Sequence, residues 1–414
     1  MIVVTDYVAN GSFASLAENV QYYNTVNYAI LIRLVDFNNN FSGEFVYVNE
    51  HAYNFLSKSK LYGDEIIISN VGANVGTVFK CPNLNKPMTL GPNSIIVKLN
   101  GNNDFYYYWF KSRYGKHCID SIVSGSAQPK FNKTHFKEMA IPVPPIKEQQ
   151  KIASILSSLD SKIENNRKIC ANLEAQAQAL FKHWFIDFAP FKDGKFVESE
   201  LGMIPEGWRV GTYSDIIKDT ISGDWGKDSS VGNYNHKVAC IRGCDFQDVK
   251  MGLRGKTPER FILEKNFQSK HFENKDVLVE ISGGTATVST GRVCPVSQLL
   301  IDKYNGDVVC TNFCKLIRPF EGYSSYLYYS WKYKYDRKVM FGYENGTSGI
   351  KNFSIKDFTT REPLVLPSLT AINEFEGIIE HIHTQIQNCG SESSKLAIIR
   401  DTLLPKLMSG EIKV

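Results

Sequence analysis

The sequence lacks long apolar runs and a regular pattern of cysteines. None of its apolar segments approaches the roughly 20 residues that a membrane-spanning helix needs. The first residues, MIVVTDYVANGSF, have neither the basic start nor the apolar centre of a secretory signal. Nine cysteines, an odd number without a framework of spacings, argue against a disulfide-built extracellular domain. We therefore expect a cytoplasmic protein that does not associate with membranes.

Motifs of common catalytic sites are missing as well. The sequence has no glycine-rich dinucleotide-binding loop between a strand and a helix, and no phosphate-binding loop with a lysine. An adenine-methyltransferase signature, Asn or Asp before two prolines and an aromatic residue, is absent, because the pair beginning at Pro144 lacks both flanks. Cys240 with Cys244, and Cys310 with Cys314, have the ligand type of a zinc site, but we interpret them as buried strand residues. We predict a non-catalytic chain without a metal or cofactor of its own.

Enough apolar residues are present to build folded domains. Hydrophobic residues make up 43% of the 414 residues and charged residues 22%, which excludes a disordered chain. The net charge of +4 is compatible with nucleic-acid binding but does not demand it. The length predicts about three structural units.

The longest helical pattern lies near the middle of the chain, from Pro144 to about His183. Apolar residues recur in it at alternating steps of four and three, a period that favours a helix coiled around a partner. The same seam recurs near the C-terminus. At 1.5 Å per residue, the first helix would span roughly 55 Å. The predicted core of the helix pair consists of Ile152, Leu156, Leu159, Ile163, Leu173, Phe375, Ile379, Ile382, Ile386 and Leu396.

Several segments of the first half recur in the second half in the same order. For example, ACIRGCDF resembles ILIRLVDF, and both contain an Arg followed three residues later by an Asp. Such ordered recurrence indicates a tandem duplication. The corresponding pairs are 30–37 with 239–246, 64–78 with 276–293, the aromatic runs that begin at 105 and 326, 125–136 with 346–358, and 141–163 with 364–386.

These patterns predict an α+β fold with two similar mixed α/β domains, separated by two long antiparallel coiled-coil helices. The expected ranges are 1–143 for the first domain, 144–187 for the central helix, 188–366 for the second domain, and 367–414 for the distal helix and tail. A pseudo-two-fold axis would cross the helix pair, and the tail would dock near the first domain to make the chain quasi-cyclic. The alternative is that each long helix is a core element of its own domain.

Three stretches carry a family resemblance: IPVPPIKEQQKIASILSSLDSKI (141–163), IPEGWRV (204–210) and RDTLLPKLMSGEI (400–412). They resemble the specificity (S) subunit of type I restriction–modification systems, and the similarity covers nearly the whole chain. One departure is that the first half has no counterpart of IPEGWRV. The natural chain therefore either starts further upstream or is shortened at this end.

The resemblance implies a DNA-binding subunit without catalytic activity. Its two target recognition domains would each read one half of a bipartite, asymmetric site on double-stranded DNA. The helix pair would set the spacer and dock two modification (methyltransferase) subunits, and restriction (motor-nuclease) subunits would join them. S-adenosylmethionine, ATP and Mg are expected in these partner subunits, not in this chain. The alternatives are a coiled-coil adaptor that binds only proteins and a self-sufficient DNA methyltransferase.

Candidate DNA contacts lie in glycine-punctuated loops and at the two repeated arginines. Asn and Gln pair with adenine and Arg or Lys with guanine in the major groove, while Ser, Thr and Lys also hold phosphates. Ordinary β-turns are the alternative for the loops, and an ion pair with Asp36 or Asp245 is the alternative for the two arginines. The candidates are Arg33, Asn70, Asn74, Thr77, Ser126, Gln128, Lys130, Asn132, Arg242, Ser282, Thr285, Thr287, Arg292, Thr347, Lys351 and Asn352.

Overall fold

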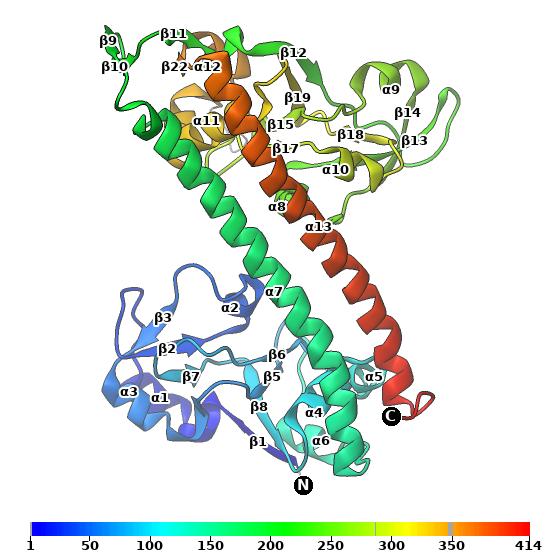
Figure 1. The fold of residues 1–414 in the computed structure, drawn as a ribbon. Coiled ribbons are helices and arrows are strands. Elements are labelled where there is room, and N and C mark those ends of the chain that lie inside the picture. Colours follow the sequence, from blue (N-terminus) through cyan, green and yellow to red (C-terminus); the bar gives the residue numbers. More distant parts are fainter. Residues whose placement is uncertain (1, 286, 347–350) are drawn as a thin grey trace. The chain divides into compact units, whose positions relative to one another are not determined.

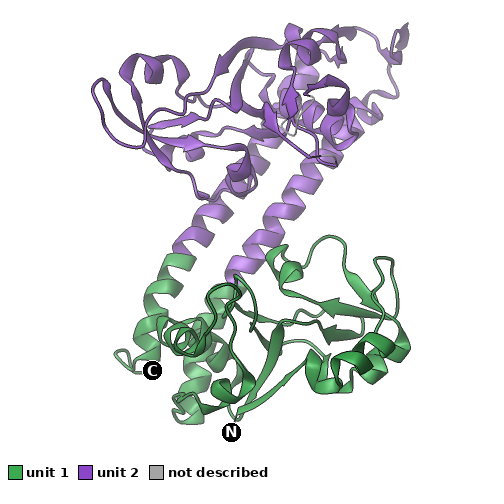
Figure 2. Cartoon of the chain, turned by 180° about the vertical axis from the view of Figure 1, so that it is seen from behind, with its two compact units in different colours: residues 1–161, 397–414 green, residues 162–396 purple. Residues whose placement is uncertain are grey.

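Contacts within the chain divide it into two units. The computed structural model describes residues 2–285, 287–346 and 351–414, whose helices and strands are labelled in Figure 1. Unit 1 consists of residues 1–161 and 397–414, and unit 2 of residues 162–396 (Figure 2). The division cuts through both long helices, so each unit contains a part of each. No helix in the described ranges is long and apolar enough to cross a membrane.

Unit 1 contains two four-stranded sheets. The first has the order β1 (Ile2–Asp6), β8 (Ser94–Leu99), β5 (Ile66–Ser69), β6 (Val78–Lys80), with antiparallel neighbours throughout. The second has the order β3 (Val46–Val48), β2 (Ala29–Ile32), β7 (Met88–Leu90), β4 (Lys60–Leu61), with β2 and β7 parallel. Every residue of β2 and β5 is buried, because these short apolar runs are covered on both faces.

Short helices connect and flank these strands. The aromatic run of α4 begins after Asn102, whose side chain accepts a hydrogen bond from the Phe105 amide at 2.9 Å and so caps the helix. Five of its aromatic side chains are buried, so this run packs the core of unit 1. The helices are α1 (Phe13–Asn19), α2 (Leu34–Asn38), α3 (Glu50–Phe55), α4 (Asn103–Lys111), α5 (Arg113–Ile122) and α6 (Lys133–Glu138), with 3-10 turns at η1 (Tyr7–Asn10) and η2 (Ser57–Ser59).

Unit 2 repeats the strand order of unit 1, except that its second sheet has three strands and lacks a counterpart of β4. Its four-stranded sheet is β12 (Ile217–Ser222), β19 (Cys314–Pro319), β15 (Val277–Glu280), β17 (Val293–Pro295), again antiparallel. Its second sheet is β14 (Glu259–Leu263), β13 (Tyr234–Ile241), β18 (Val308–Cys310), with β13 and β18 parallel. Three smaller sheets complete this unit. The first has the order β16 (Ser282–Gly283), β21 (Lys351–Phe353), β20 (Glu344–Asn345), the second pairs β11 (Arg209–Thr212) with β22 (Pro363–Leu366), and the third pairs β9 (Phe196–Ser199) with β10 (Gly202–Pro205). Both units therefore have the predicted mixed α/β content.

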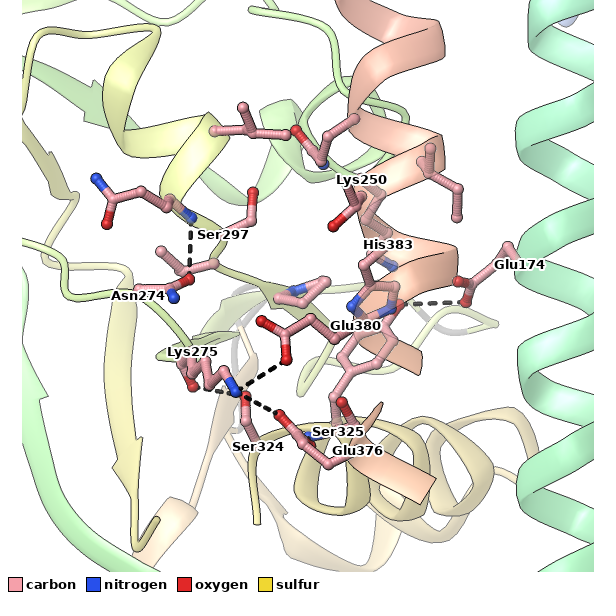
Figure 3. A pocket seen from close by; sticks show the side chains of 18 residues that line it. Glu174, Lys250, Asn274, Lys275, Ser297, Ser324, Ser325, Glu376, Glu380 and His383 are labelled. Carbon is pink, nitrogen blue, oxygen red and sulfur yellow. Dashed lines mark hydrogen bonds and ion pairs between the residues drawn. The ribbon is translucent and has the colours of Figure 1, made fainter. Parts of the chain in front are cut away.

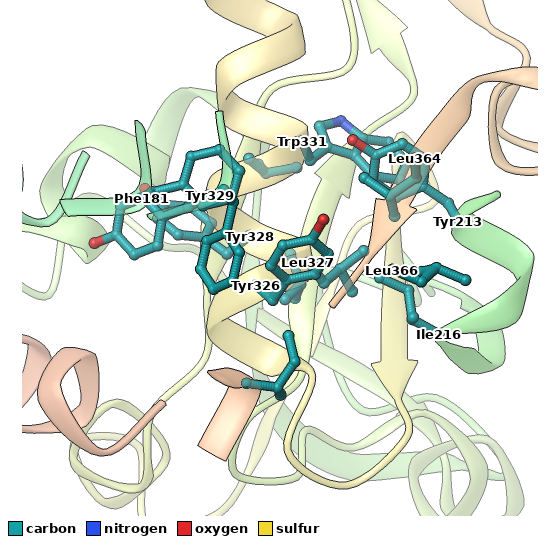
Figure 4. Packing of buried hydrophobic residues seen from close by; sticks show 14 of the residues in the cluster. Phe181, Tyr213, Ile216, Tyr326, Leu327, Tyr328, Tyr329, Trp331, Leu364 and Leu366 are labelled. Atoms are coloured by element: carbon teal, nitrogen blue, oxygen red, sulfur yellow. The ribbon is translucent and has the colours of Figure 1, made fainter. Parts of the chain in front are cut away.

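The core of unit 2 is built around the aromatic residues of α11. Figure 4 shows Tyr326, Tyr328 and Tyr329 beside Phe181, and all of them are buried. This second tyrosine run therefore packs the core, as the first one does. The helices of this unit are α8 (Phe246–Lys250), α9 (Glu264–Lys270), α10 (Gln298–Asp302), α11 (Ser324–Asp336) and α12 (Ile355–Arg361), with 3-10 turns at η3 (Ala189–Phe191), η4 (Tyr213–Asp215), η5 (Gly243–Asp245) and η6 (Val339–Tyr343).

The two longest helices, α7 (Ile146–Phe185) and α13 (Leu369–Met408), have 40 residues each. Within unit 2 they run antiparallel. Asn166 on α7 donates from Nδ2 to the Ser393 hydroxyl at 3.3 Å, whereas the later Cys170 donates to the carbonyl of the earlier Ile386 at 3.6 Å. The apolar seams thus meet within this unit, side by side along the two helices.

The seam residues differ in burial. Two buried seam positions that an apolar pattern does not reveal are Asn166 and Cys170. Asn166 also donates to the Cys389 carbonyl at 3.3 Å and to the Glu392 carboxylate at 2.7 Å. A polar seam residue with such partners favours one register of the helices. Of the predicted core residues, Ile152, Leu156, Phe375, Ile379 and Ile386 are buried, and Leu159, Ile163, Leu173, Ile382 and Leu396 are half-buried.

Candidate nucleic-acid interface

Four strands of unit 2 end at one edge of its sheets. The last residue of β12 pairs with Lys315, and the last residue of β15 pairs with Cys314, so both strands end where β19 begins. β13 and β18 are parallel and end side by side, and the Thr311 amide donates to the Ile241 carbonyl at 3.0 Å. The loops that follow these four strands therefore meet at this edge.

The two candidate loops of unit 2 are joined there by a small sheet. Ser282 of β16 pairs with Asn352 of β21. Lys351 Nζ lies 2.9 Å from a carboxylate oxygen of Glu344, whose other oxygen accepts from the Thr290 amide at 2.6 Å and hydroxyl at 2.8 Å. Burial opposes ionisation of Glu344, but Lys351 and Thr290 hold its pKa below the usual value. Segments that are 54 or more residues apart in sequence thus form one surface.

The two candidate loops of unit 1 are joined in the same way. A bridge pairs Val71 with Lys130, and the Phe131 amide donates to the Asn70 carbonyl at 3.1 Å. The structure therefore brings together, in each unit, the two loops that the sequence singled out separately. On these loops Asn74, Ser126, Gln128 and Lys130 are exposed, and Asn70 and Thr77 are half-buried.

The two repeated arginines are engaged in internal ion pairs. Arg33 donates from Nε and Nη2 to the Asp36 carboxylate at 3.1 and 2.8 Å. Arg242 makes the same two contacts with Asp245 at 3.0 and 3.1 Å, and also donates to the Lys256 carbonyl at 2.9 Å. Hydrogen bonding by Asp245 raises the pKa of Arg242. The ion pair, the alternative that the sequence left open, is therefore present in both units.

Other candidates also have structural partners. Arg292 forms a bidentate pair with the buried Glu280, at 2.7 and 2.6 Å. The Asn132 side chain accepts from the His135 amide at 2.8 Å and caps α6. The Thr285 hydroxyl accepts from the amides of Thr287 and Val288 at 3.2 and 3.0 Å. These side chains hold the loops in shape.

One candidate, Thr347, lies outside the described residues. Sequence reasoning missed three residues at the edge of unit 2: Trp225, Asn312 and Phe313 line a pocket together with Arg242 and Ser282. The segment around Trp225 has no counterpart among the repeated segments, so comparison of the two halves could not reveal it. The signal that identifies these residues is the solvent exposure of the two aromatic rings, and exposure is known only from the folded chain.

A different pocket of unit 2, beside α13, is lined by charged groups that pair with one another (Figure 3). Lys275 lies 3.5 Å from Glu376 and 3.3 Å from Glu380. The Tyr329 hydroxyl lies 2.8 Å from His383 Nε2, and burial lowers the pKa of His383 to about 4. These contacts connect α13 to the core of unit 2, so we interpret the pocket as structural.

In residues 2–285, 287–346 and 351–414, no group of three or more His, Cys, Asp and Glu side chains could hold a metal ion. Of the four cysteines considered above, Cys240, Cys310 and Cys314 are buried and Cys244 is exposed. All four are free thiols.

Comparison with known proteins gives one consistent family. Residues 12–175 match the family described as type I restriction modification DNA specificity domain. The chain is 28% identical over 386 residues to the type I restriction enzyme MjaIX specificity subunit of Methanocaldococcus jannaschii, covering 90% of this chain and 84% of the relative. It is 24% identical over 343 residues to the HindI specificity subunit of Haemophilus influenzae, covering 69% of this chain and 71% of the relative.

The fold also has a solved counterpart. The structure aligns with the crystal structure of the S subunit of a type I restriction–modification system from M. genitalium, with a TM-score of 0.52. The alignment covers 98% of this chain and 96% of that chain at 16% identity. At that identity the likeness concerns the fold. The family resemblance predicted from the sequence is confirmed by these findings.

Proposed function

We propose that this chain, which is similar to type I restriction–modification specificity subunits, is the DNA-sequence specificity subunit of such a complex. Units 1 and 2 each read one half of a bipartite, asymmetric site on double-stranded DNA. The chain itself is non-catalytic. Two methyltransferase subunits dock on the helix pair and methylate adenine with S-adenosylmethionine, and restriction subunits with ATP and Mg complete the complex.

The observation that carries this proposal is that each unit has an edge built in the same way. In each unit, two loops from distant parts of the sequence are joined at the ends of matching strands. The side chains that these loops present are different, with Asn74 and Gln128 in unit 1 and Thr285 and Lys351 in unit 2. Two similar frames with different donors and acceptors suit a site whose two halves differ in sequence.

The long helices support the spacer part of the proposal. Two 40-residue helices with antiparallel seams can hold two recognition domains at a set distance, as dimer geometry does for half-sites. In unit 1, the tail residues Leu407, Ile412 and Val414 pack in the same core as Val4 and Leu156. This contact supports a quasi-cyclic chain in which the tail returns to the first domain.

The decisive experiment is co-expression of this chain with its methyltransferase partner, followed by genome-wide mapping of methylated adenines. The expected result is one motif with two defined halves and an undefined spacer of fixed length. The partner expressed without this chain is the control. Methylation without a bipartite motif, or the same motif in the control, would contradict the proposal. An absence of DNA binding at every salt concentration would favour the adaptor that binds only proteins.

A matched deletion tests the spacer. Removing seven residues from α7 and the seven facing residues from α13 shortens both helices by about 10 Å. Because B-DNA rises about 3.4 Å per base pair, the preferred spacer should shorten by about three base pairs while both half-sites stay the same. A variant in which exposed residues of the same helical turns are replaced by alanine should keep the original spacer. An unchanged spacer in the deletion variant would disprove the proposal that helix length sets the spacer.

A further inference from the structure

An apolar pocket opens at the same edge of unit 2 as the candidate loops. Trp225 and Phe313 line it and are 37% and 57% exposed, although both side chains are large and apolar. Arg242 and Ser282, two DNA-contact candidates from the sequence, line the same pocket. Exposed apolar side chains that converge beside polar groups are typical of binding sites. The pocket is therefore continuous with the proposed DNA-reading surface.

Trp225 is fixed in place by a buried arginine. The guanidinium carbon of Arg260 lies 4.2 Å from the centre of the Trp225 ring, and its Nε donates to the Trp225 carbonyl at 2.8 Å. Arg260 also pairs with Asp228. The next residue, Gly226, has a φ of +60°, and a Cβ there would lie 2.3 Å from the Phe261 carbonyl oxygen. A ring that is held before binding loses little conformational freedom when a ligand covers it.

Phe313 lies in the tight turn between β18 and β19, and its backbone is equally well fixed. The Cys314 amide donates to the Thr311 carbonyl at 2.9 Å, and the Ile281 amide donates to the Phe313 carbonyl at 2.9 Å. The second hydrogen bond ties this turn to the link between β15 and β16. A fixed backbone with an exposed aromatic ring is characteristic of a residue that anchors a partner.

Unit 1 has no aromatic residue at the corresponding place. There the Asn70 amide donates to the Asn93 carbonyl at 3.0 Å, which is the counterpart of the bond between Ile281 and Phe313. The turn between β7 and β8 reads Gly91, Pro92, Asn93. The apolar anchor is therefore a property of unit 2 alone at this position, on a backbone that both units share.

We propose that Trp225 and Phe313 contact the 5-methyl group of a thymine in the half-site read by unit 2. The inference rests on the proposed function and adds a substrate feature to it. The thymine methyl is the apolar group that base pairs present in the major groove, whereas the other groups there are hydrogen-bond donors and acceptors. An apolar pocket bordered by Arg242 and Ser282 matches a methyl group flanked by such polar groups.

The test uses the complex with the methyltransferase partner and synthetic duplexes that contain the mapped site. Each thymine of the unit 2 half-site is replaced in turn by uracil, which differs only by the missing methyl group. One replacement should weaken binding about fourfold, the effect of one buried methyl. In Phe313→Ala the same replacement should have almost no effect. Phe313→Leu, which keeps an apolar side chain, should retain most of the discrimination.

Two controls separate the possible failures. Uracil replacements in the unit 1 half-site, and the matched variant Asn93→Ala, should leave the Phe313-dependent discrimination unchanged. Three results would each overturn the thymine contact. They are equal affinity for thymine and uracil duplexes, a unit 2 half-site without thymine, and a Phe313→Ala variant that binds both duplexes more weakly but discriminates between them as well as the unmodified chain does. If the unmodified complex showed no sequence-specific DNA binding, the proposed function itself would be contradicted. Thermal unfolding of Phe313→Ala verifies that it is folded.

Discussion

Units 1 and 2 have sheets of the same order but different side chains at matching places. The Tyr108 hydroxyl in unit 1 donates to Asp160 at 2.8 Å, and Asp160 pairs with Arg400 at 2.6 Å. In unit 2 the corresponding Tyr329 hydroxyl lies 2.8 Å from His383. The Tyr329 hydroxyl also donates to the Glu174 carboxylate at 3.1 Å. Both units therefore keep a hydrogen bond from this tyrosine to a carboxylate, and unit 2 adds an imidazole as a second partner. The backbone frame is therefore what the units share, and side-chain chemistry is what distinguishes them.

In contrast, the ion pairs after β2 and β13 keep the same side chains in both units. Arg33 with Asp36, and Arg242 with Asp245, have the same geometry, and each Asp carboxylate is buried. Because this contact closes the turn between a strand and the following helix, it belongs to the shared frame. Variants of these contacts separate those that belong to the shared frame from those that belong to one unit.

The largest effect is expected in the aromatic cores. Trp331→Ala in unit 2 should cost about 4 kcal/mol of unfolding free energy, and the corresponding Phe110→Ala in unit 1 about 3 kcal/mol. Trp331 costs more because its indole N–H also donates to the Gly291 carbonyl at 2.9 Å, which would be left unpaired. Chemical denaturation of the whole chain, monitored by hydrogen exchange in peptides that report on each unit, measures both losses of unfolding free energy. A Trp331→Ala effect that appeared mainly in unit 1 would contradict the division into units.

The shared ion pair should give equal losses in the two units. Asp36→Ala and Asp245→Ala should each cost about 3 kcal/mol, because the arginine and a backbone amide lose a buried acceptor. Those amides are the ones of Arg33 and Arg242, which donate at 2.8 and 3.0 Å. Asp→Asn at either position keeps one acceptor and should cost less. A large loss at one position and none at the other would show that the pair is not part of a common frame.

Acid should destabilise unit 2 through His383. Burial lowers the pKa of His383 to about 4 in the folded chain, while an unfolded His has a pKa near 6.5. The unfolded chain therefore binds the proton first, and stability is lost as the pH falls from about 6.5 towards 4. The loss should reach about 3 kcal/mol at pH 4. His383→Gln should flatten this part of the profile. An identical pH profile for the variant and the natural chain would refute the assignment.

The smallest effect concerns helix capping. Asn132 caps α6 in unit 1 and Ser354 caps α12 in unit 2, where its hydroxyl accepts from the Asp357 amide at 3.4 Å. Alanine at either position should cost about 1 kcal/mol. Asn132→Asp, which keeps a capping oxygen, should restore most of it. If Asn132→Ala weakened DNA binding beyond its effect on stability, the side chain would have a role in recognition as well.

Local patterns in the sequence predicted the positions of the loops and the long helices, but not which residues their side chains contact. Alternating glycines located the loops around Asn70 and Ser282, and heptad spacing located the long helices. Asn166 escaped because a polar residue interrupts an apolar seam, and its partners lie more than 220 residues away. Arg292 was predicted as a free donor candidate, yet it is held by Glu280, a residue whose orientation depends on the neighbouring strand.

By itself, the sequence determined the family resemblance, the order of the segments in each half and the loops that carry the candidate donors, because these follow from local spacing and motifs. Only the tertiary structure decided that Arg33 and Arg242 are paired, that two distant loops join in each unit, and that Trp225 and Phe313 share a pocket with Ser282. The physical reason is strand order. Neighbours in a sheet are chosen by pairing across the whole domain, so the loops that meet at one edge cannot be recognised from their positions along the chain.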